Sequence, residues 1–179
     1  MRVIGGEARG RTLKGPPRTG VRPTSDLVRG VIYDLLAAQE ADLTSVLDLY
    51  SGTGALGVEA LSRGAERCDF VEADPKACDV IRENLARTGT LDRGRVFCMP
   101  VARALQRLTG SYTLVVADPP YEYDRAESEL AAAIEQGLLA PGGILVVEHS
   151  KRRSWPEELA GRRQVLSRRH GDTRITVYR

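Results

Sequence analysis

The chain has 179 residues, of which 42% are hydrophobic and 28% are charged, and this composition predicts one folded domain with its own core. No apolar run approaches the roughly 18 residues of a membrane span, and neither a signal peptide nor a CxxC spacing among the three cysteines is present. These features argue against a membrane protein, a disulfide scaffold and a metal site, and they favour a cytoplasmic protein.

The charge is unevenly distributed along the chain, although the net charge is only +2. Residues 1–30 carry a net charge of +5 and residues 151–179 carry +6, whereas residues 31–150 carry −9. Two basic ends on an acidic body favour contact with a polyanion. The alternative is that both ends are solvated segments that keep the protein soluble.

The predicted elements begin with a basic hairpin arm over residues 1–20, in which short β-prone stretches are separated by glycines. Residues 21–179 are predicted to form one domain that starts with a helix capped by Thr24 or Ser25. Apolar runs then alternate with amphipathic segments. The runs predict strands over 46–50, 68–73, 95–99, 112–117, 144–148, 162–169 and 173–178, and the segments predict helices over 55–63, 75–87, 101–108 and 125–139.

Repeated strand-then-helix units predict a doubly wound α/β fold. We expect a mostly parallel, seven-stranded sheet with helices on both faces and an antiparallel last strand. Cys78 and Cys98 lie among apolar neighbours in the sequence, so we expect both in the core.

A glycine-rich motif lies between the first predicted strand and the following helix. Gly52, Gly54 and Gly57 match GxGxxG, and Glu72 follows twenty residues after Gly52 at the end of the next strand. Glycines permit close approach of the backbone to a ligand, and an acid at this spacing can accept hydrogen bonds from ribose hydroxyls. Asp48 would repel a dinucleotide pyrophosphate at the helix N-terminus. It suits the ammonium and sulfonium groups of S-adenosylmethionine, which is therefore the expected cofactor.

A second motif, Asp118-Pro119-Pro120-Tyr121, directly follows the buried strand over 112–117. This position is the carboxyl edge of the sheet, where ligand sites of α/β proteins lie. A carboxylate and a backbone carbonyl that accept the N–H bonds of an exocyclic base amine favour its nucleophilic, pyramidal form. The prolines fix the backbone, and the tyrosine ring can stack on a base taken out of its stack.

These motifs resemble those of class I S-adenosylmethionine-dependent amino-methyltransferases. More narrowly, the chain resembles the bacterial RsmD-type family, which methylates the exocyclic N2 of one guanine in 16S ribosomal RNA. The resemblance rests on residues 2–13, 22–29, 52–65 and 118–121. Tyr50-Ser51 stands where the family pattern has Phe-Ala.

The resemblance implies a role for each matching residue and a small-ribosomal-subunit partner, and we expect the enzyme to be a monomer. The methionine end of the cofactor would be lined by Asp48, Ser51, Gly52 and Gly54, its ribose held by Glu72, and its adenine placed near Val101 and Ala102. The target guanine would be held by the catalytic motif Asp118, Pro119, Pro120 and Tyr121. The RNA would be contacted by Arg2, Arg9, Arg11, Lys14, Arg22 and Arg29.

Three alternatives stay open on the residues alone. The tetrapeptide at 118–121 also suits a DNA adenine or cytosine amino-methyltransferase, although 179 residues leave no room for a separate DNA-recognition domain. An NAD-dependent oxidoreductase conflicts with Asp48, and a non-catalytic RNA-binding assembly factor does not need the intact 118–121 motif. Glu148, at the end of the strand over 144–148, has either a structural or an active-site role.

Overall fold

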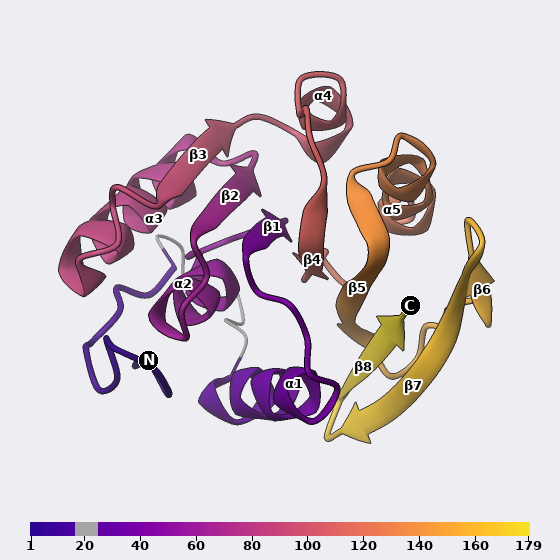
Figure 1. Ribbon diagram of the computed structural model, residues 1–179, viewed down its shortest axis with the longest axis horizontal. Helices are drawn as coiled ribbons and strands as arrows, with labels where there is room; N and C mark the ends of the chain where they lie inside the picture. Colours follow the sequence, from indigo (N-terminus) through magenta and orange to yellow (C-terminus); the bar gives the residue numbers. More distant parts are fainter. Residues whose placement is uncertain (17–24) are drawn as a thin grey trace.

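The helices and strands of a computed structural model of the chain follow the alternation in the sequence (Figure 1). The structure describes residues 1–16 and 25–179. The helices are α1 (Asp26–Ala38), α2 (Ala55–Ser62), α3 (Pro75–Thr88), α4 (Val101–Leu105) and α5 (Ala126–Glu135). The strands are β1 (Ser45–Leu49), β2 (Arg67–Glu72), β3 (Gly94–Cys98), β4 (Tyr112–Ala117), β5 (Leu139–Ser150), β6 (Glu158–Leu159), β7 (Arg162–His170) and β8 (Thr173–Tyr178).

The strands form a mixed sheet in the order β3-β2-β1-β4-β5-β8-β7-β6. Strands β1 to β5 pair in parallel, and β8 pairs with both β5 and β7 in the antiparallel direction. The predicted parallel sheet with antiparallel C-terminal strands is therefore confirmed. The predicted number of strands is wrong, because the short β6 adds an eighth strand through two residue pairs with β7.

Local sequence signals account for several element ends. Ser25 caps α1 by accepting a hydrogen bond from the Val28 amide, and Asp74 caps α3 with Pro75 as its first residue. Gly89 ends α3 in the left-handed conformation, at φ 73°. The helix predicted over 125–139 ends early, at Glu135, because Gly137 turns the chain at φ 77° into β5. Thr24, the alternative cap, lies outside the described residues.

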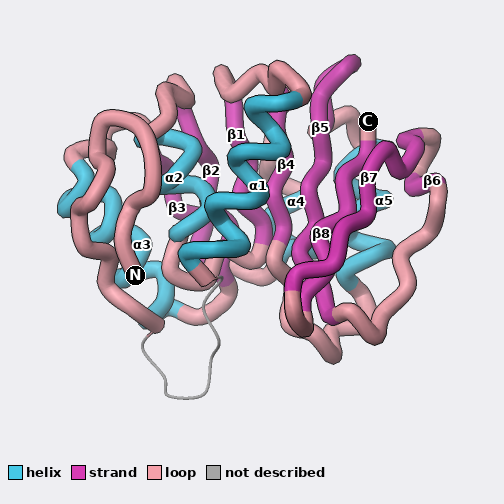
Figure 2. Tube along the Cα trace, turned by 90° about the horizontal axis from the view of Figure 1, so that it is seen from below, coloured by secondary structure: helices cyan, strands magenta, loops and turns pink. Residues whose placement is uncertain are grey.

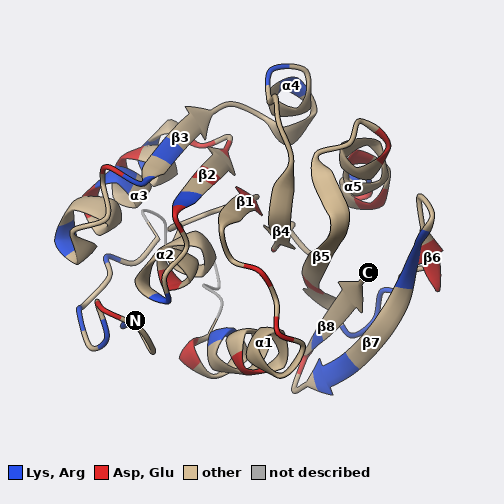
Figure 3. Ribbon diagram, in the orientation of Figure 1, with Lys and Arg blue, Asp and Glu red and all other residues tan. Residues whose placement is uncertain are grey.

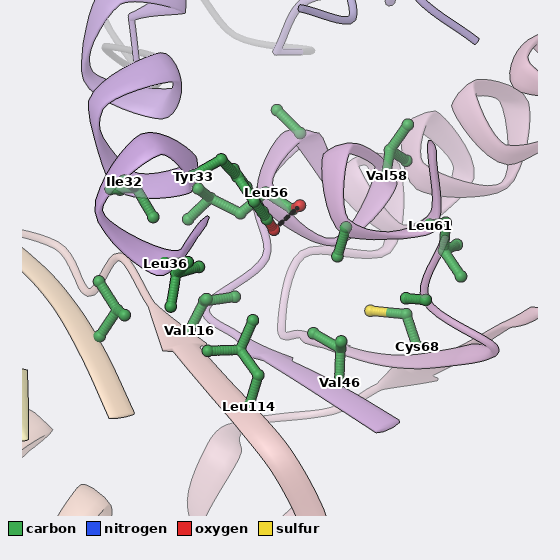
Figure 4. Packing of buried hydrophobic residues seen from close by; sticks show 14 of the residues in the cluster. Ile32, Tyr33, Leu36, Val46, Leu56, Val58, Leu61, Cys68, Leu114 and Val116 are labelled. Atoms are coloured by element: carbon green, nitrogen blue, oxygen red, sulfur yellow. Dashed lines mark hydrogen bonds between the residues drawn. The ribbon is translucent and has the colours of Figure 1, made fainter. Parts of the chain in front are cut away.

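Each face of the sheet carries its own apolar core, as the predicted doubly wound arrangement requires. Helices α1, α2 and α3 cover one face, and α4 and α5 cover the other (Figure 1). On the first face, Tyr33 of α1 is buried, and its hydroxyl donates to the Leu56 carbonyl of α2 at 2.7 Å (Figure 4). The pKa of Tyr33 is raised, mainly by burial. Cys78 is buried as expected, whereas Cys98 is exposed because it ends the edge strand β3.

The predicted β-hairpin arm has no strands within residues 1–16, the part of it that the structure describes. Its two limbs contact each other through an isolated bridge between Arg2 and Thr12 and through backbone hydrogen bonds, such as the one from the Val3 amide to the Arg11 carbonyl at 3.0 Å. The segment instead packs onto the domain through Val3, Ala8 and Leu13, which are 2%, 2% and 3% exposed and belong to the core beneath α1 and α2. Apolar side chains inside a basic segment thus bind it to the fold, and Figure 2 shows the path of this segment beside α2 and α3.

A buried carboxylate holds this N-terminal segment to α2. Glu59 is fully buried and accepts hydrogen bonds from the amides of Ile4 at 2.9 Å and Gly5 at 2.8 Å. The guanidinium groups of Arg63 and Arg29 lie 2.8 Å and 3.5 Å from its oxygens. The sequence predicts an RNA contact for Arg29, and this prediction is wrong, because the side chain is fully buried in this network.

Candidate active site

The loop after β1 has the backbone geometry that its glycines allow. Tyr50, Gly52 and Gly54 adopt positive φ angles of 58°, 54° and 75°. Gly54 caps α2, while a Cβ at Gly52 would meet no heavy atom within 4 Å. Gly57 has a different role, because a Cβ there would lie 2.3 Å from the Phe70 ring. The loop therefore presents bare backbone at Gly52 and packs tightly at Gly57.

Asp48 lies near the end of β1 and is 1% exposed. Its Oδ2 atom accepts a hydrogen bond from the Gly57 amide at 2.9 Å, which places a carboxylate at the N-terminus of α2. Its Oδ1 atom is buried without a hydrogen-bond partner among the described residues. The pKa of Asp48 is raised to about 8, first by burial and then by the nearby carboxylates of Asp118 and Glu72, against the lowering effects of the hydrogen bonds from Gly57 and Ser51. A cation beside Oδ1 would favour the ionised form.

Glu72 ends β2 and connects three segments of the site. Its Oε2 atom accepts from the Gly52 amide at 2.8 Å, and its Oε1 atom accepts from the Asp74 amide, also at 2.8 Å. A carboxylate has about four lone-pair sites, so both oxygens retain the capacity to accept from ribose hydroxyls. Glu72 also pairs with Cys98 across β2 and β3, just before the start of α4.

The remaining predicted cofactor residues support the site mainly through packing and backbone. The Ser51 hydroxyl donates to the carbonyl oxygens of Asp48 at 2.7 Å and Val71 at 3.2 Å, so this side chain braces the loop. At the start of α4, the Val101 side chain is buried in the core while Ala102 is exposed. We therefore expect Ser51 and Val101 to shape the site rather than to recognise polar groups of a ligand.

We call the loop over residues 50–54 the glycine loop, and the loop over residues 118–125, which begins with the second motif, the acceptor loop. The two loops lie side by side. Asp118 follows β4, and its amide donates to the carbonyl of Leu49, the last residue of β1, at 3.4 Å. Pro119 is buried, while Pro120 and Tyr121 are exposed, Tyr121 to 39%. The two motifs, 70 residues apart in the sequence, thus meet at the carboxyl edge of the sheet.

Two residues that the sequence analysis did not select hold the acceptor loop. The Tyr121 hydroxyl lies 2.7 Å from Thr173 Oγ1 of β8, and Thr173 donates to Glu148 Oε1 at 3.4 Å. On the other side, buried Glu129 of α5 accepts from the hydroxyls of both Tyr50, at 2.6 Å, and Tyr123, at 2.8 Å. These contacts raise the pKa of Tyr50, after burial as the first cause. Glu129 therefore connects the glycine loop with the acceptor loop.

The predicted RNA-binding residues do not gather at this edge. Arg2, Arg9, Arg11 and Lys14 are exposed, and Arg22 lies outside the described residues. Arg11 donates to the Arg87 carbonyl near the C-terminal end of α3, and Glu7 contacts Ser62 at the end of α2. Both helices end at the amino edge of the sheet. Of these exposed residues, Lys14 comes nearest to the glycine loop, because Asn84 joins its carbonyl to that of Thr53.

A hollow of about 280 Å³ opens at the amino edge of the sheet, away from both motifs. Its lining includes Arg95 and Tyr112, which both bond to Asp69, Arg95 through two nitrogens at 3.1 Å and 2.8 Å. These contacts pair the Asp69 carboxylate of the hollow with a cation and a hydroxyl of its own lining. The described residues contain no cluster of three side chains able to hold a metal ion, and no described helix is long and apolar enough to cross a bilayer.

Three observations indicate that the carboxyl edge of the sheet can hold a cationic nucleoside cofactor. The buried Asp48 Oδ1 atom has no hydrogen-bond partner among the described residues, the space over Gly52 is open, and Glu72 lies one strand away from Asp48. S-adenosylmethionine requires these three features: a carboxylate that balances its positive charge, bare backbone that allows close approach, and an acceptor for its ribose hydroxyls.

Comparison with known proteins places the chain among methyltransferases. The family model described as "Conserved hypothetical protein 95" matches residues 1–179. The chain is 34% identical to "Putative rRNA methyltransferase YlbH" of Bacillus subtilis, covering 100% of this chain and 98% of that protein. It is 35% identical to "Ribosomal RNA small subunit methyltransferase D" of Escherichia coli, covering 83% and 74%.

The solved structure of "Putative methyltransferase yhhF from Escherichia coli" has a similar fold. Its TM-score is 0.85 at 31% identity, over 99% of this chain and 96% of that one. The similarity therefore includes both the glycine loop and the acceptor loop as well as the C-terminal strands.

Proposed function

The chain belongs to the family described as conserved hypothetical protein 95, the RsmD and YlbH group of class I S-adenosylmethionine-dependent methyltransferases, and on that basis we propose that it methylates the exocyclic N2 amine of a guanine in 16S ribosomal RNA. The observation that carries this proposal is the contact between the two motif loops at one sheet edge, through the Asp118 amide and the Leu49 carbonyl. That contact brings a cofactor site and a base site together.

On the cofactor side, each carboxylate has a separate task. S-adenosylmethionine supplies an electrophilic methyl group on a sulfonium. Asp48, whose Oδ1 atom is buried, would balance the positive charge of the methionine end. Glu72 would accept hydrogen bonds from the ribose hydroxyls while its bonds to the Gly52 and Asp74 amides hold it in place. Gly52 would admit the ligand to the backbone, and Gly54, packed against Ile81 and Phe70, would hold the left-handed turn into α2.

On the acceptor side, Asp118 and the Pro119 carbonyl would accept the N–H bonds of the target amine. This arrangement exposes the nitrogen lone pair, which is otherwise delocalised into the ring, and it orients the amine for in-line attack. Pro120 limits the backbone freedom of the loop. The half-exposed Tyr121 ring, fixed at its hydroxyl by Thr173, would stack on the flipped base.

Labelled methyl transfer to small ribosomal particles from a strain that lacks the homologous enzyme tests the proposal. We expect incorporation into 16S RNA that ribonuclease removes. Transfer to duplex DNA supplied as a second substrate, with none to the particles, would instead favour the DNA amino-methyltransferase alternative. Binding of the particles without any transfer would favour a non-catalytic assembly factor.

Glu72 gives a prediction for cofactor affinity. Charge-assisted hydrogen bonds contribute roughly 1.5–3 kcal/mol each, so we expect Glu72→Ala to weaken S-adenosylmethionine binding by at least about tenfold. Glu72→Gln, which keeps one acceptor oxygen, should give a smaller loss. Calorimetric titration of folded variants measures both constants. Unchanged affinity in the alanine variant would show that Glu72 does not hold the ribose.

Asp48 gives a prediction for pH dependence. Its pKa of about 8 in the free protein means that the carboxyl is largely protonated at lower pH. A bound cation lowers that pKa, so binding below this value releases a proton, and affinity should rise with pH by up to about tenfold per unit before it levels off. The pH profiles of Asp48→Asn and the unmodified protein separate this contribution from titration of the cofactor's own amine. Identical profiles would contradict the assignment.

A further inference from the structure

The turn between β7 and β8 lies at the carboxyl edge of the sheet, beside the acceptor loop. Strand β5 runs parallel to β4 and ends at Ser150, which pairs with Thr173 at the start of β8. The Lys151 amide donates to the Asp172 carbonyl at 2.9 Å, so the chain after β5 is joined to this turn. Figure 2 shows the turn at the opposite end of the strands from the C-terminus.

Direct contacts connect this region to the acceptor loop. Thr173, the first residue of β8, holds the Tyr121 hydroxyl at 2.7 Å. Arg153 donates to the carbonyls of Tyr123 at 2.7 Å and Asp124 at 3.3 Å. A base held on Tyr121 would therefore have its flanking nucleotides next to the turn.

Basic side chains gather on this end of the hairpin. We call them the basic rim, which consists of Lys151, Arg152, Arg168, Arg169 and Arg174. Arg152, Arg168 and Arg169 are exposed, and Asp172 is the acid of the turn, paired with Lys151. Figure 3 shows basic residues at both ends of β7, and the end that leads into β8 is the one beside the site.

Two of the rim arginines hydrogen-bond to neutral oxygens, so these contacts leave their charge uncompensated. Arg169 Nε donates to the Gly171 carbonyl at 2.9 Å, and Arg174 Nη1 donates to Ser167 Oγ at 3.1 Å. The pKa of nearby His149 is lowered to about 4, first by burial and then by Arg174 and Arg153, which is consistent with a positive potential here.

At the other end of the chain, carboxylates compensate two of the basic residues, whereas Arg2 and Arg11 also donate to neutral carbonyl oxygens. Lys14 pairs with Glu83, Arg29 pairs with Glu59, and Arg11 donates to the Arg87 carbonyl at 2.8 Å. Carboxylates thus compensate Lys14 and Arg29, and Arg11 lies at the amino edge, away from Asp118. Among the basic residues that the structure describes at the two ends of the chain, those of the C-terminal hairpin adjoin the acceptor loop.

We propose that the basic rim binds phosphates of the RNA backbone next to the target nucleotide, an inference that rests on the proposed function. Arginine and lysine side chains contact phosphates without reading sequence, so the rim would position the substrate while the base is read at Asp118–Tyr121. Phosphate contacts release counterions, which makes the binding strongly salt-dependent.

The test compares two double variants that remove equal charge. Arg168→Gln with Arg169→Gln changes the rim, whereas Arg107→Gln with Arg163→Gln changes exposed arginines outside it. Binding of protein-free 16S RNA is measured against salt concentration, and the KM for small ribosomal particles is measured with labelled S-adenosylmethionine. S-adenosylmethionine affinity serves as the check that each variant is folded.

We expect the rim variant to bind RNA at least about tenfold more weakly and to lower the salt slope by about 1.4–1.8, which is 0.7–0.9 for each of two lost contacts. Its KM should rise, and the control should keep both values. An unchanged slope and KM in the rim variant, or equal losses in the control, would overturn the proposal. A loss seen only with assembled particles would also overturn it and assign the rim to a ribosomal protein.

Failure of the proposed function has a different signature. The unmodified protein could bind RNA with a salt slope that depends on the rim and yet transfer no methyl group to it. That result would confirm the rim as an RNA-binding surface and contradict the proposed reaction. If the unmodified protein methylates 16S RNA and the rim variant does so with the same KM and salt slope, the reaction stands and the rim proposal fails.

Discussion

Asp118→Ala is expected to lower kcat by at least about a hundredfold, the size of effect seen when one preorganised polar group is removed from a reacting centre. The carboxylate follows β4 at the point where the two motif loops touch, and the proposal assigns it to the acceptor amine rather than to the cofactor. Its loss should therefore appear in kcat, with S-adenosylmethionine affinity largely retained. Single-turnover methylation with labelled cofactor, together with calorimetric binding, measures the two effects separately.

Asp124→Ala is the matched control for this substitution. Asp124 is an exposed aspartate in the same loop, and its backbone carbonyl accepts a hydrogen bond from Arg153. The control should keep near-normal turnover. Near-normal turnover of the Asp118→Ala variant would show that Asp118 has no role in the reaction.

Glu59→Ala is expected to reduce the free energy of unfolding by about 3–5 kcal/mol, because it leaves buried partners of a charge network uncompensated. Arg29 is fully buried beside Glu59, and the amides of Ile4 and Gly5 lose their acceptor. The N-terminal segment should detach from α2 as a result. Urea denaturation measures the free energy, and amide exchange at Ile4 and Gly5 reports the detachment.

Glu83→Ala provides the comparison for this stability prediction. Glu83 also pairs with a residue of the N-terminal segment, Lys14, and with Arg87, but these pairs lie at the surface. Surface ion pairs contribute little to stability, so its effect should be much smaller. A loss below about 1 kcal/mol in Glu59→Ala, the range of a surface pair, would contradict the role assigned to the buried network.

The elements that the sequence predicts well are those set by neighbouring residues. The apolar run at Tyr112–Ala117 and the helix signals at Asp74 and Gly89 all appear in the structure where the sequence places them. Both motifs also lie at the ends of the predicted strands. Local patterns suffice here, because strand alternation, capping and left-handed glycines depend on a few adjacent residues.

Features that depend on distant partners were not predictable in the same way. Arg29 has the charge of a surface residue, and two of the partners that compensate it when buried are distant in the sequence, the Glu59 carboxylate and the Arg2 carbonyl. Glu129 and Thr173 carry no motif, and their link to the loops appears only when α5 and β8 are placed. The N-terminal segment resembles a basic arm until Val3, Ala8 and Leu13 are seen in the core.

Nucleoside analysis of the methylated product tests the central claim most directly. Small ribosomal particles from a strain lacking the homologous enzyme are incubated with the protein and labelled S-adenosylmethionine, and their 16S RNA is digested to nucleosides. The assignment of Asp118–Tyr121 to a guanine amine predicts that the label elutes as N2-methylguanosine. Label in a methylated adenosine or cytidine, or label that resists ribonuclease, would contradict it.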